Sequence, residues 1–112
     1  RRYLLGTDSL GRDILARMVT NLKRVYVALH SFPQARDATE LLIALDPADA
    51  TQLRDRGLLA YQMRDLSPAL RDLQEYLART ADAAETAGEK DDDRDQIREY
   101  VKTLRKRVAD LN

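Results

Sequence analysis

The feature of this sequence that most constrains its fold is a pattern that occurs twice, at an offset of 34 residues. The corresponding positions include Leu29 and Met63, Phe32 and Leu66, Ala35 and Ala69, and Ala44 and Ala78. A unit of this length holds two helices and a turn, and it buries its apolar face by stacking on a neighbour. The pattern therefore predicts an all-α fold, with repeat one at about residues 16–49 and repeat two at about residues 50–83.

Apolar residues in and around the repeats recur at steps of three and four, the spacing of one face of an α-helix. We expect five helices, at about residues 9–29, 33–45, 48–63, 67–79 and 94–111. The first should begin at an N-cap formed by Asp8 or Ser9, after a lead-in at residues 1–8. Its apolar positions form one stripe, which consists of Leu10, Ile14, Leu15, Met18, Leu22, Val25, Tyr26 and Leu29.

Prolines and a change of composition predict where the helices end. Pro33 suits the first turn of the second helix, where its missing N–H costs little. Pro47 disfavours helix at the preceding residue and so ends the second helix. Residues 80–93 are small, polar and acidic, and we expect a flexible acidic loop there.

The last predicted helix, at about residues 94–111, has a single apolar stripe. Its members alternate at steps of four and three, and they are Ile97, Val101, Leu104, Val108 and Leu111. A terminal repeat left uncovered exposes its apolar face to solvent. We therefore expect this helix to cap the second repeat, and we expect residues 1–112 to form a single domain.

Composition argues against several classes of function. Lys plus Arg and Asp plus Glu are 19 each, so net charge is zero, and we expect neither a nucleic acid nor a membrane partner. The absence of cysteine excludes a disulfide, a thiolate metal site and a cysteine nucleophile. No apolar run reaches the roughly 18 residues that span a bilayer. With no secretory signal visible, we expect a cytoplasmic protein.

Candidate metal and cofactor groups are few. His30 is the only histidine, and with no second histidine or cysteine it lacks partners for a metal site. The carboxylates at Asp91, Asp92 and Asp93 lack the turn glycine and the spacing of a calcium loop, and they suit the start of the last helix. Glycine patterns for phosphate or dinucleotide binding are missing. We expect no metal, no cofactor and no catalytic residue.

The two units resemble tetratricopeptide (TPR) repeats, which have a period of 34 residues. With Ala16 and Ala50 as first positions, Ala35 and Ala69 match the small residues where the two helices cross, and Gly57 matches the small residue facing them. Pro47, Leu22 and Tyr26 match the closing proline and two large positions. Departures are Lys23 in place of the glycine, Arg56 in place of a large apolar residue and Ala81 in place of the closing proline. The resemblance implies right-handed superhelical stacking of the hairpins.

Longer stretches resemble the C-terminal TPR region of bacterial transglutaminase-like proteins. They are ILARMVTNLKRVYVAL at residues 14–29, LLIALDP at residues 41–47 and RDRGLLAYQMRDLSPALRDLQEYL at residues 54–77. In that family a papain-like transglutaminase domain precedes a helical tail of this kind. The resemblance implies that this chain is an accessory part of a larger bacterial protein whose Cys, His and Asp residues lie elsewhere.

The resemblance to TPR repeats implies a candidate binding groove on the first helix of each repeat. The side chains that it puts on this face are Arg17, Asn21, Arg24, Arg54, Asp55, Leu58 and Gln62. Guanidinium groups there can hold a carboxylate bidentately. The alternative is that residues 54–56 pair with neighbours such as Asp72 or Glu75 and only orient the bundle. Arg56, at a position that is usually apolar, favours an internal ion pair.

Three functions follow as hypotheses. The first is a non-enzymatic interaction or scaffold domain that binds a protein or peptide segment, including an upstream domain of its own chain. Two repeats are fewer than the roughly three that usually make a self-sufficient array, which motivates the upstream partner. The second is a regulatory part of an acyl-transfer or peptidase-like enzyme that tunes substrate access. The third is self-association through a helix face, although we expect a monomer rather than a homodimer.

Overall fold

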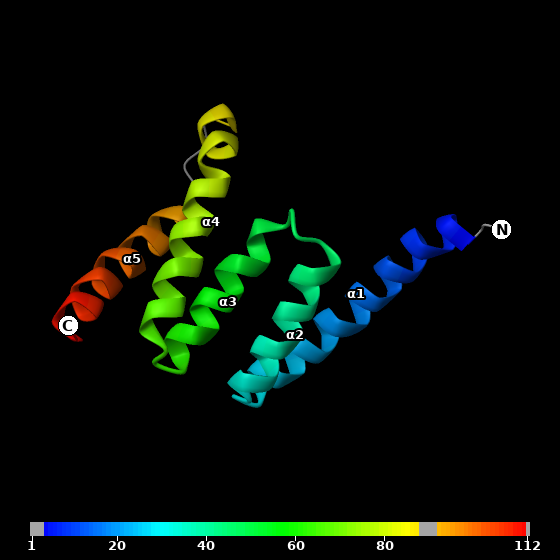
Figure 1. Ribbon diagram of the computed structural model, residues 1–112, viewed down its shortest axis with the longest axis horizontal. Helices are drawn as coiled ribbons and strands as arrows, with labels where there is room; N and C mark the ends of the chain where they lie inside the picture. The colour runs from blue at the N-terminus through cyan, green and yellow to red at the C-terminus, as the bar shows by residue number, and fades with distance from the viewer. Residues whose placement is uncertain (1–3, 88–91, 112) are drawn as a thin grey trace. The chain divides into compact units, whose positions relative to one another are not determined.

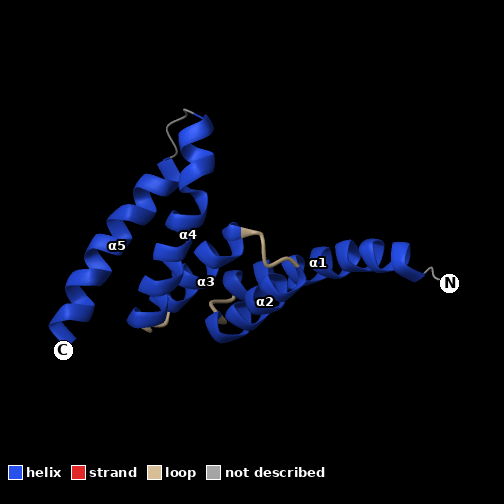
Figure 2. Ribbon diagram, turned by 45° about the horizontal axis from the view of Figure 1, so that its top comes forward, coloured by secondary structure: helices blue, strands red, loops and turns tan. Residues whose placement is uncertain are grey.

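The computed structural model describes residues 4–87 and 92–111, and this part of the chain contains five α-helices and no strand (Figures 1 and 2). The helices are α1 (Leu4–Ala28), α2 (Phe32–Leu45), α3 (Ala50–Gln62), α4 (Leu66–Ala87) and α5 (Asp92–Leu111). The predicted all-α class is confirmed. The chain divides into two compact units, unit 1 at Arg1–Ala48 and unit 2 at Asp49–Asn112, and this division falls within one residue of the predicted repeat boundary.

Unit 1 is one hairpin, in which α1 packs against α2. Its core is small and consists of Val19, Ala38 and Leu42, with Ala16 and Leu45 packed against it. Pro33 lies in the first turn of α2, and the helix ends where Asp46 N–H donates to Leu42 O at 3.0 Å. The predicted bounds of α2 are therefore confirmed to within one residue.

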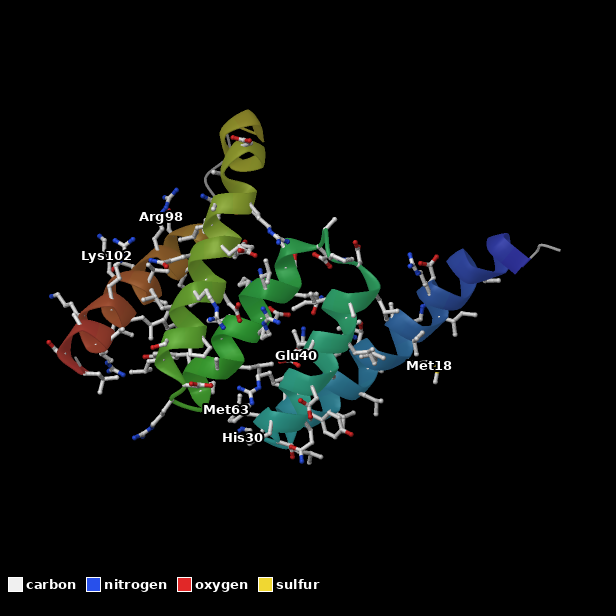
Figure 3. The ribbon with its side chains drawn as sticks, in the orientation of Figure 1. Met18, His30, Glu40, Met63, Arg98 and Lys102 are labelled. Carbon is white, nitrogen blue, oxygen red and sulfur yellow. The ribbon has the colours of Figure 1, made fainter. Side chains whose placement is uncertain are left out.

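The predicted start of α1 is wrong. The helix begins at Leu4, so residues 4–8 are helical and no cap at Asp8 or Ser9 starts it. No proline lies in residues 1–28, and a helix tolerates single glycines such as Gly6 and Gly11 at about 1 kcal/mol each. Most of the predicted stripe is also exposed; Leu10, Met18 and Leu29 have 62%, 58% and 68% of their surface accessible. Figure 3 shows Met18 projecting from α1 on the side away from α2.

Unit 2 begins with a second hairpin, α3 packed against α4. Asp49 caps α3 by accepting a hydrogen bond from Thr51 N–H at 3.0 Å. Gly57 lies against α4: a Cβ atom added there would come 2.8 Å from Leu73 Cγ and 3.3 Å from Ala69 O. The glycine thus allows the two helices to approach closely, as its match to the small position of the repeat predicts.

The turns that end α1 and α3 have the same geometry, again 34 residues apart. His30 and Arg64 have left-handed backbone, with φ of 57° and 61°. After each, an N–H reaches back to the fifth carbonyl before it: Ser31 N–H to Tyr26 O and Asp65 N–H to Ala60 O, both 2.8 Å. This is the hydrogen bond that closes a Schellman cap. The internal repeat is therefore visible in the backbone as well as in the sequence.

The predicted acidic loop is wrong for residues 80–87, because α4 continues to Ala87. The segment contains Ala81, Ala83, Ala84 and Ala87, and alanine has the highest helix propensity. Ala81 stands where the first repeat has Pro47, so nothing stops the helix there. The rest of that predicted loop before α5, residues 88–91, lies outside the described residues.

The last helix, α5, packs on α4 as a cap. It begins at Asp92, two residues before the predicted start. Ile97, Val101 and Leu104 are buried and Val108 is half-buried, which confirms most of the predicted stripe. Leu111 is the exception, with 72% of its surface exposed. No helix in the described part of the chain has the length and apolarity needed to cross a membrane.

Candidate functional site

The seven predicted groove residues lie on two helices, one in each unit. Three are on α1 of unit 1 and four are on α3 of unit 2. Within each helix they recur at steps that keep them on one side. The structure therefore presents two candidate surfaces, each within its own unit.

On α1, Arg17, Asn21 and Arg24 are all exposed. Neither arginine forms an ion pair with another described residue. A shallow depression beside them is lined by Met18, Asn21, Leu22 and Val25. This side of α1 therefore combines two available cations with apolar surface, which suits a carboxylate-bearing protein segment.

On α3, the polar groups are already engaged. Arg54 Nε and Nη2 both donate to Asp55 Oδ1 at 3.2 Å, and the guanidinium lies 5.9 Å from the centre of the Tyr76 ring. Burial alone lowers the pKa of Arg54, but the Asp55 carboxylate, with a smaller contribution from Tyr76, raises that pKa above its ordinary value. Arg54 therefore stays charged, and Asp55 already neutralises it.

The remaining two α3 residues extend the same side of the helix. Leu58 is half-buried and Gln62 is exposed. At four and eight positions after Arg54, they continue its face by about one helical turn each. They add one apolar and one amide contact to the surface.

Arg56 belongs to the packing of unit 2. Its Nε donates to Asp72 Oδ2 at 2.8 Å and its Nη2 to Asp72 Oδ1 at 3.0 Å, a bidentate pair between α3 and α4. Asp72 keeps only 7% of its side chain exposed. The expected internal ion pair is confirmed for Arg56, whereas Glu75 pairs with Arg79 on its own helix.

Sequence periodicity did not predict the contact between two tyrosines, one on α3 and one on α5. The rings of Tyr61 and Tyr100 meet edge to face, with centroids 5.3 Å apart and planes at 61°. They line a small open cleft together with Gln96, Glu99 and Thr103. Tyr61 follows Leu58 by three positions and so lies on the predicted face, but its partner on α5 is separated from it by 39 positions and has no place in the 34-residue register.

The candidate metal groups gain no support. His30 is exposed and its ring stacks on Phe32, with centroids 5.5 Å apart. In residues 4–87 and 92–111, no three His, Cys, Asp or Glu side chains lie close enough to hold a metal ion. The side chains of the acidic run at Asp91–Asp93 lie outside the described part.

Comparison with known proteins finds two similar relatives in one bacterial species. The chain is 38% identical over 66 residues to a UPF0162 protein of Xylella fastidiosa strain Temecula1, and 36% identical over 66 residues to a UPF0162 protein of strain 9a5c. Each match covers 59% of this chain and 24% of the relative, so the matched part spans about a quarter of the curated relatives. No solved structure matches. Residues 22–102 match the tetratricopeptide repeat family, and because this is most of the chain, the protein belongs to that family.

Proposed function

We propose that this chain is a non-enzymatic protein-interaction domain whose α3–α5 face binds a segment of another polypeptide or domain. The observation that carries the proposal is the cleft that Tyr61 and Tyr100 line, which adjoins the side of α3 that bears Leu58 and Gln62. Interfaces concentrate their binding energy in aromatic anchors surrounded by polar groups. This face has both components.

The chemistry of the cleft favours an extended segment with an apolar side chain at one position. Two tyrosine rings offer flat apolar walls, and Gln96, Glu99 and Thr103 supply hydrogen-bonding groups at the rim. Arg17 and Arg24 on α1 form a second candidate surface within unit 1, where they offer two cations to acidic residues of a partner. Arg54 contributes less, because binding a ligand carboxylate requires it to release or share Asp55.

We propose further that the chain is the accessory part of a larger bacterial, cytoplasmic protein of the transglutaminase-like kind. The resemblance over residues 14–77 is the ground for the transglutaminase-like kind. The relatives in Xylella fastidiosa, of which the matched part is only 24%, support only a longer bacterial parent. The reading frame around the gene tests it. A preceding domain with Cys, His and Asp in catalytic arrangement agrees with the proposal, and a start codon immediately before Arg1 contradicts it.

The interaction itself is tested by NMR. The ¹⁵N-labelled chain is titrated with the domain that precedes it in the parent polypeptide. We expect amide shifts at Leu58, Tyr61 and Gln62 on α3 and at Tyr100 on α5, and smaller shifts at Arg17 and Arg24. Shifts confined to other surfaces, or no shifts, contradict the proposal.

A matched pair of α5 variants sharpens the test. Tyr100→Ser removes one wall of the cleft, and we expect it to weaken binding by about 10-fold or more, the usual effect of losing an aromatic anchor. Arg98→Ser is the control, because Arg98 projects from the outer side of α5 (Figure 3) and pairs with Asp95 at 3.0 Å. Equal affinities for the two variants would place the partner elsewhere. Light scattering at high concentration checks the expected monomer.

A further inference from the structure

The side of α1 that α2 leaves uncovered carries a regular apolar stripe. We call Leu15, Met18, Leu22, Val25 and Leu29 the α1 stripe; they follow one another at steps of 3, 4, 3 and 4. Their exposed fractions are 41%, 58%, 50%, 52% and 68%. This spacing is the seam along which one helix packs lengthwise against another. Five large apolar side chains in such a row form a contiguous patch, which marks an interaction site on a soluble protein.

The same spacing recurs on α5, where it is buried. We call Ile97, Val101, Leu104 and Val108 the α5 stripe; each lies 79 positions after its counterpart Met18, Leu22, Val25 or Leu29. Ile97, Val101 and Leu104 are 3%, 7% and 0% exposed, and Val108 is half-buried. The element that α5 packs on is α4, the second helix of the hairpin before it. In this chain, therefore, a stripe with this spacing is covered by the second helix of the preceding hairpin.

We propose that the α1 stripe is the docking face for the second helix of a further helical hairpin. This hairpin precedes α1 in the same polypeptide, in the way that the α3–α4 hairpin precedes α5. The order of elements argues for this source: α4 ends at Ala87 and α5 begins at Asp92, so a short connection brings a preceding helix onto this face. The relatives, about four times the length of the match, contain additional chain that can supply such a helix. The docked helix packs on α1 in the same way as α4 packs on α5.

The contacts between α4 and α5 define what that helix must carry. Leu77 O accepts a hydrogen bond from Arg94 at 3.2 Å, and Thr80 Oγ1 accepts another from the same guanidinium. Arg94 lies 79 positions after Leu15, so on α1 this polar contact is replaced by an apolar one. The partner helix therefore needs leucine-like residues at steps of three and four. It does not need a hydrogen-bond acceptor where it packs beside Leu15.

A second copy of this chain is the main rival occupant. Two α1 stripes can pair with each other, but the side of α4 that faces α5 is already covered, so a second copy offers no α4-type helix. The docking face is also separate from the Tyr61–Tyr100 cleft, and its failure leaves the proposed interaction at that cleft standing.

Photo-cross-linking in the full natural polypeptide tests the proposal. p-Benzoylphenylalanine replaces Leu22, in the middle of the α1 stripe, and in a control it replaces Leu111, which is 72% exposed near the end of α5. We expect irradiation at position 22 to give an intramolecular cross-link to a helix that precedes α1, mapped by mass spectrometry, and no such product at position 111. Cross-links between two copies, cross-links to another protein, or none at position 22 overturn the proposal, as does a natural polypeptide without residues before Arg1.

A chimera gives an independent measurement. A second copy of residues 49–93 is joined directly before residue 15, which reproduces the step from α4 to α5 in front of α1. We expect the melting temperature of the α1–α2 hairpin to rise by about 5 °C or more, since additional apolar surface is buried. Leu70→Glu and Leu77→Glu in the added copy should cancel the rise. No rise, or a rise that survives both substitutions, overturns the proposal.

Discussion

The α1 stripe and the α5 stripe have the same spacing and opposite environments. Met18, Leu22 and Val25 are half or more exposed, whereas Ile97, Val101 and Leu104 are almost fully buried. The difference lies in the partner: α4 covers α5, and α2 packs on the other side of α1. An apolar stripe thus specifies a surface that needs a partner, and the rest of the fold decides whether the chain supplies one.

The largest difference between the two stripes should appear on truncation to alanine. Leu104→Ala removes a side chain that is 0% exposed, and we expect a loss of about 4 kcal/mol in unfolding free energy from transfer and cavity terms. Leu22→Ala removes a side chain that is 50% exposed, and we expect a loss of about 0.5 kcal/mol. Urea denaturation of residues 1–112 measures both. Similar losses at the two positions would mean that the α1 stripe is covered in solution.

This contrast also shows which features of the fold can be predicted from the sequence. The 34-residue register predicted the helices, the crossing at Gly57 and the Arg56 pair, because these depend on contacts between neighbouring segments. It did not predict whether the apolar stripe of α1 is buried, since steps of three and four carry no information about which helix covers the stripe. It also did not predict the extension of α4: the small and acidic residues after Arg79 have the composition of a loop, but the alanines among them favour helix.

The same limit applies to the candidate site, whose seven groove residues stay a prediction. The resemblance to TPR repeats placed Arg54, Leu58 and Gln62 on one side of α3. The Tyr61–Tyr100 contact depends on where α5 comes to lie, and α5 starts outside the repeat period because α4 is longer than α2. Ion pairs such as Arg54–Asp55 require side-chain geometry, which no spacing rule supplies.

Repeat two also has an ion pair between two positions at which repeat one has apolar residues. Arg56 and Asp72 of repeat two stand at the positions of Leu22 and Ala38 in repeat one. We expect Arg56→Leu to cost about 3 kcal/mol, because it leaves the Asp72 carboxylate buried and unpaired. Adding Asp72→Ala should recover on the order of 2 kcal/mol, since an apolar pair needs no counter-charge.

Denaturation of the two single variants and the double variant gives the coupling energy of the pair. The expected coupling is large because the hydrogen bonds at 2.8 and 3.0 Å are bidentate. Additive losses, with the double variant least stable of all, would show that Asp72 is stabilised by other groups and that repeat two does not tolerate Leu and Ala at these two positions.

Glycine-to-alanine substitutions should change stability in opposite directions in the two units. At Gly57 a Cβ would come 2.8 Å from Leu73 Cγ, and Leu73 is fully buried, so we expect Gly57→Ala to cost about 1–3 kcal/mol. At Gly11 no atom lies within 4 Å of an added Cβ, and we expect Gly11→Ala to add about 0.5–1 kcal/mol through helix propensity. Thermal denaturation followed by circular dichroism measures both signs. A neutral Gly57→Ala would mean that α3 and α4 separate easily.

The turns after α1 and α3 are the part in which the two units agree most closely, so they should show the smallest differences. Arg64 has φ of 61°, where a side chain costs about 1–2 kcal/mol, and glycine recovers most of this while it adds entropy to the unfolded chain. We expect Arg64→Gly to raise the unfolding free energy by about 0.5–1 kcal/mol. His30→Gly relieves a φ of 57° but loses the stacking on Phe32, so its gain should be smaller.

Equilibrium denaturation at neutral pH measures the gain in unfolding free energy for Arg64→Gly and for His30→Gly. A gain at Arg64 that exceeds the gain at His30 agrees with two equal backbone caps that differ only by one ring contact. If His30→Gly gains as much as Arg64→Gly, the stacking contributes nothing, and the shared Schellman geometry alone determines both turns. If neither gains, relief of the left-handed backbone is cancelled by the entropy of glycine, and the repeats differ in stability only through their helix faces.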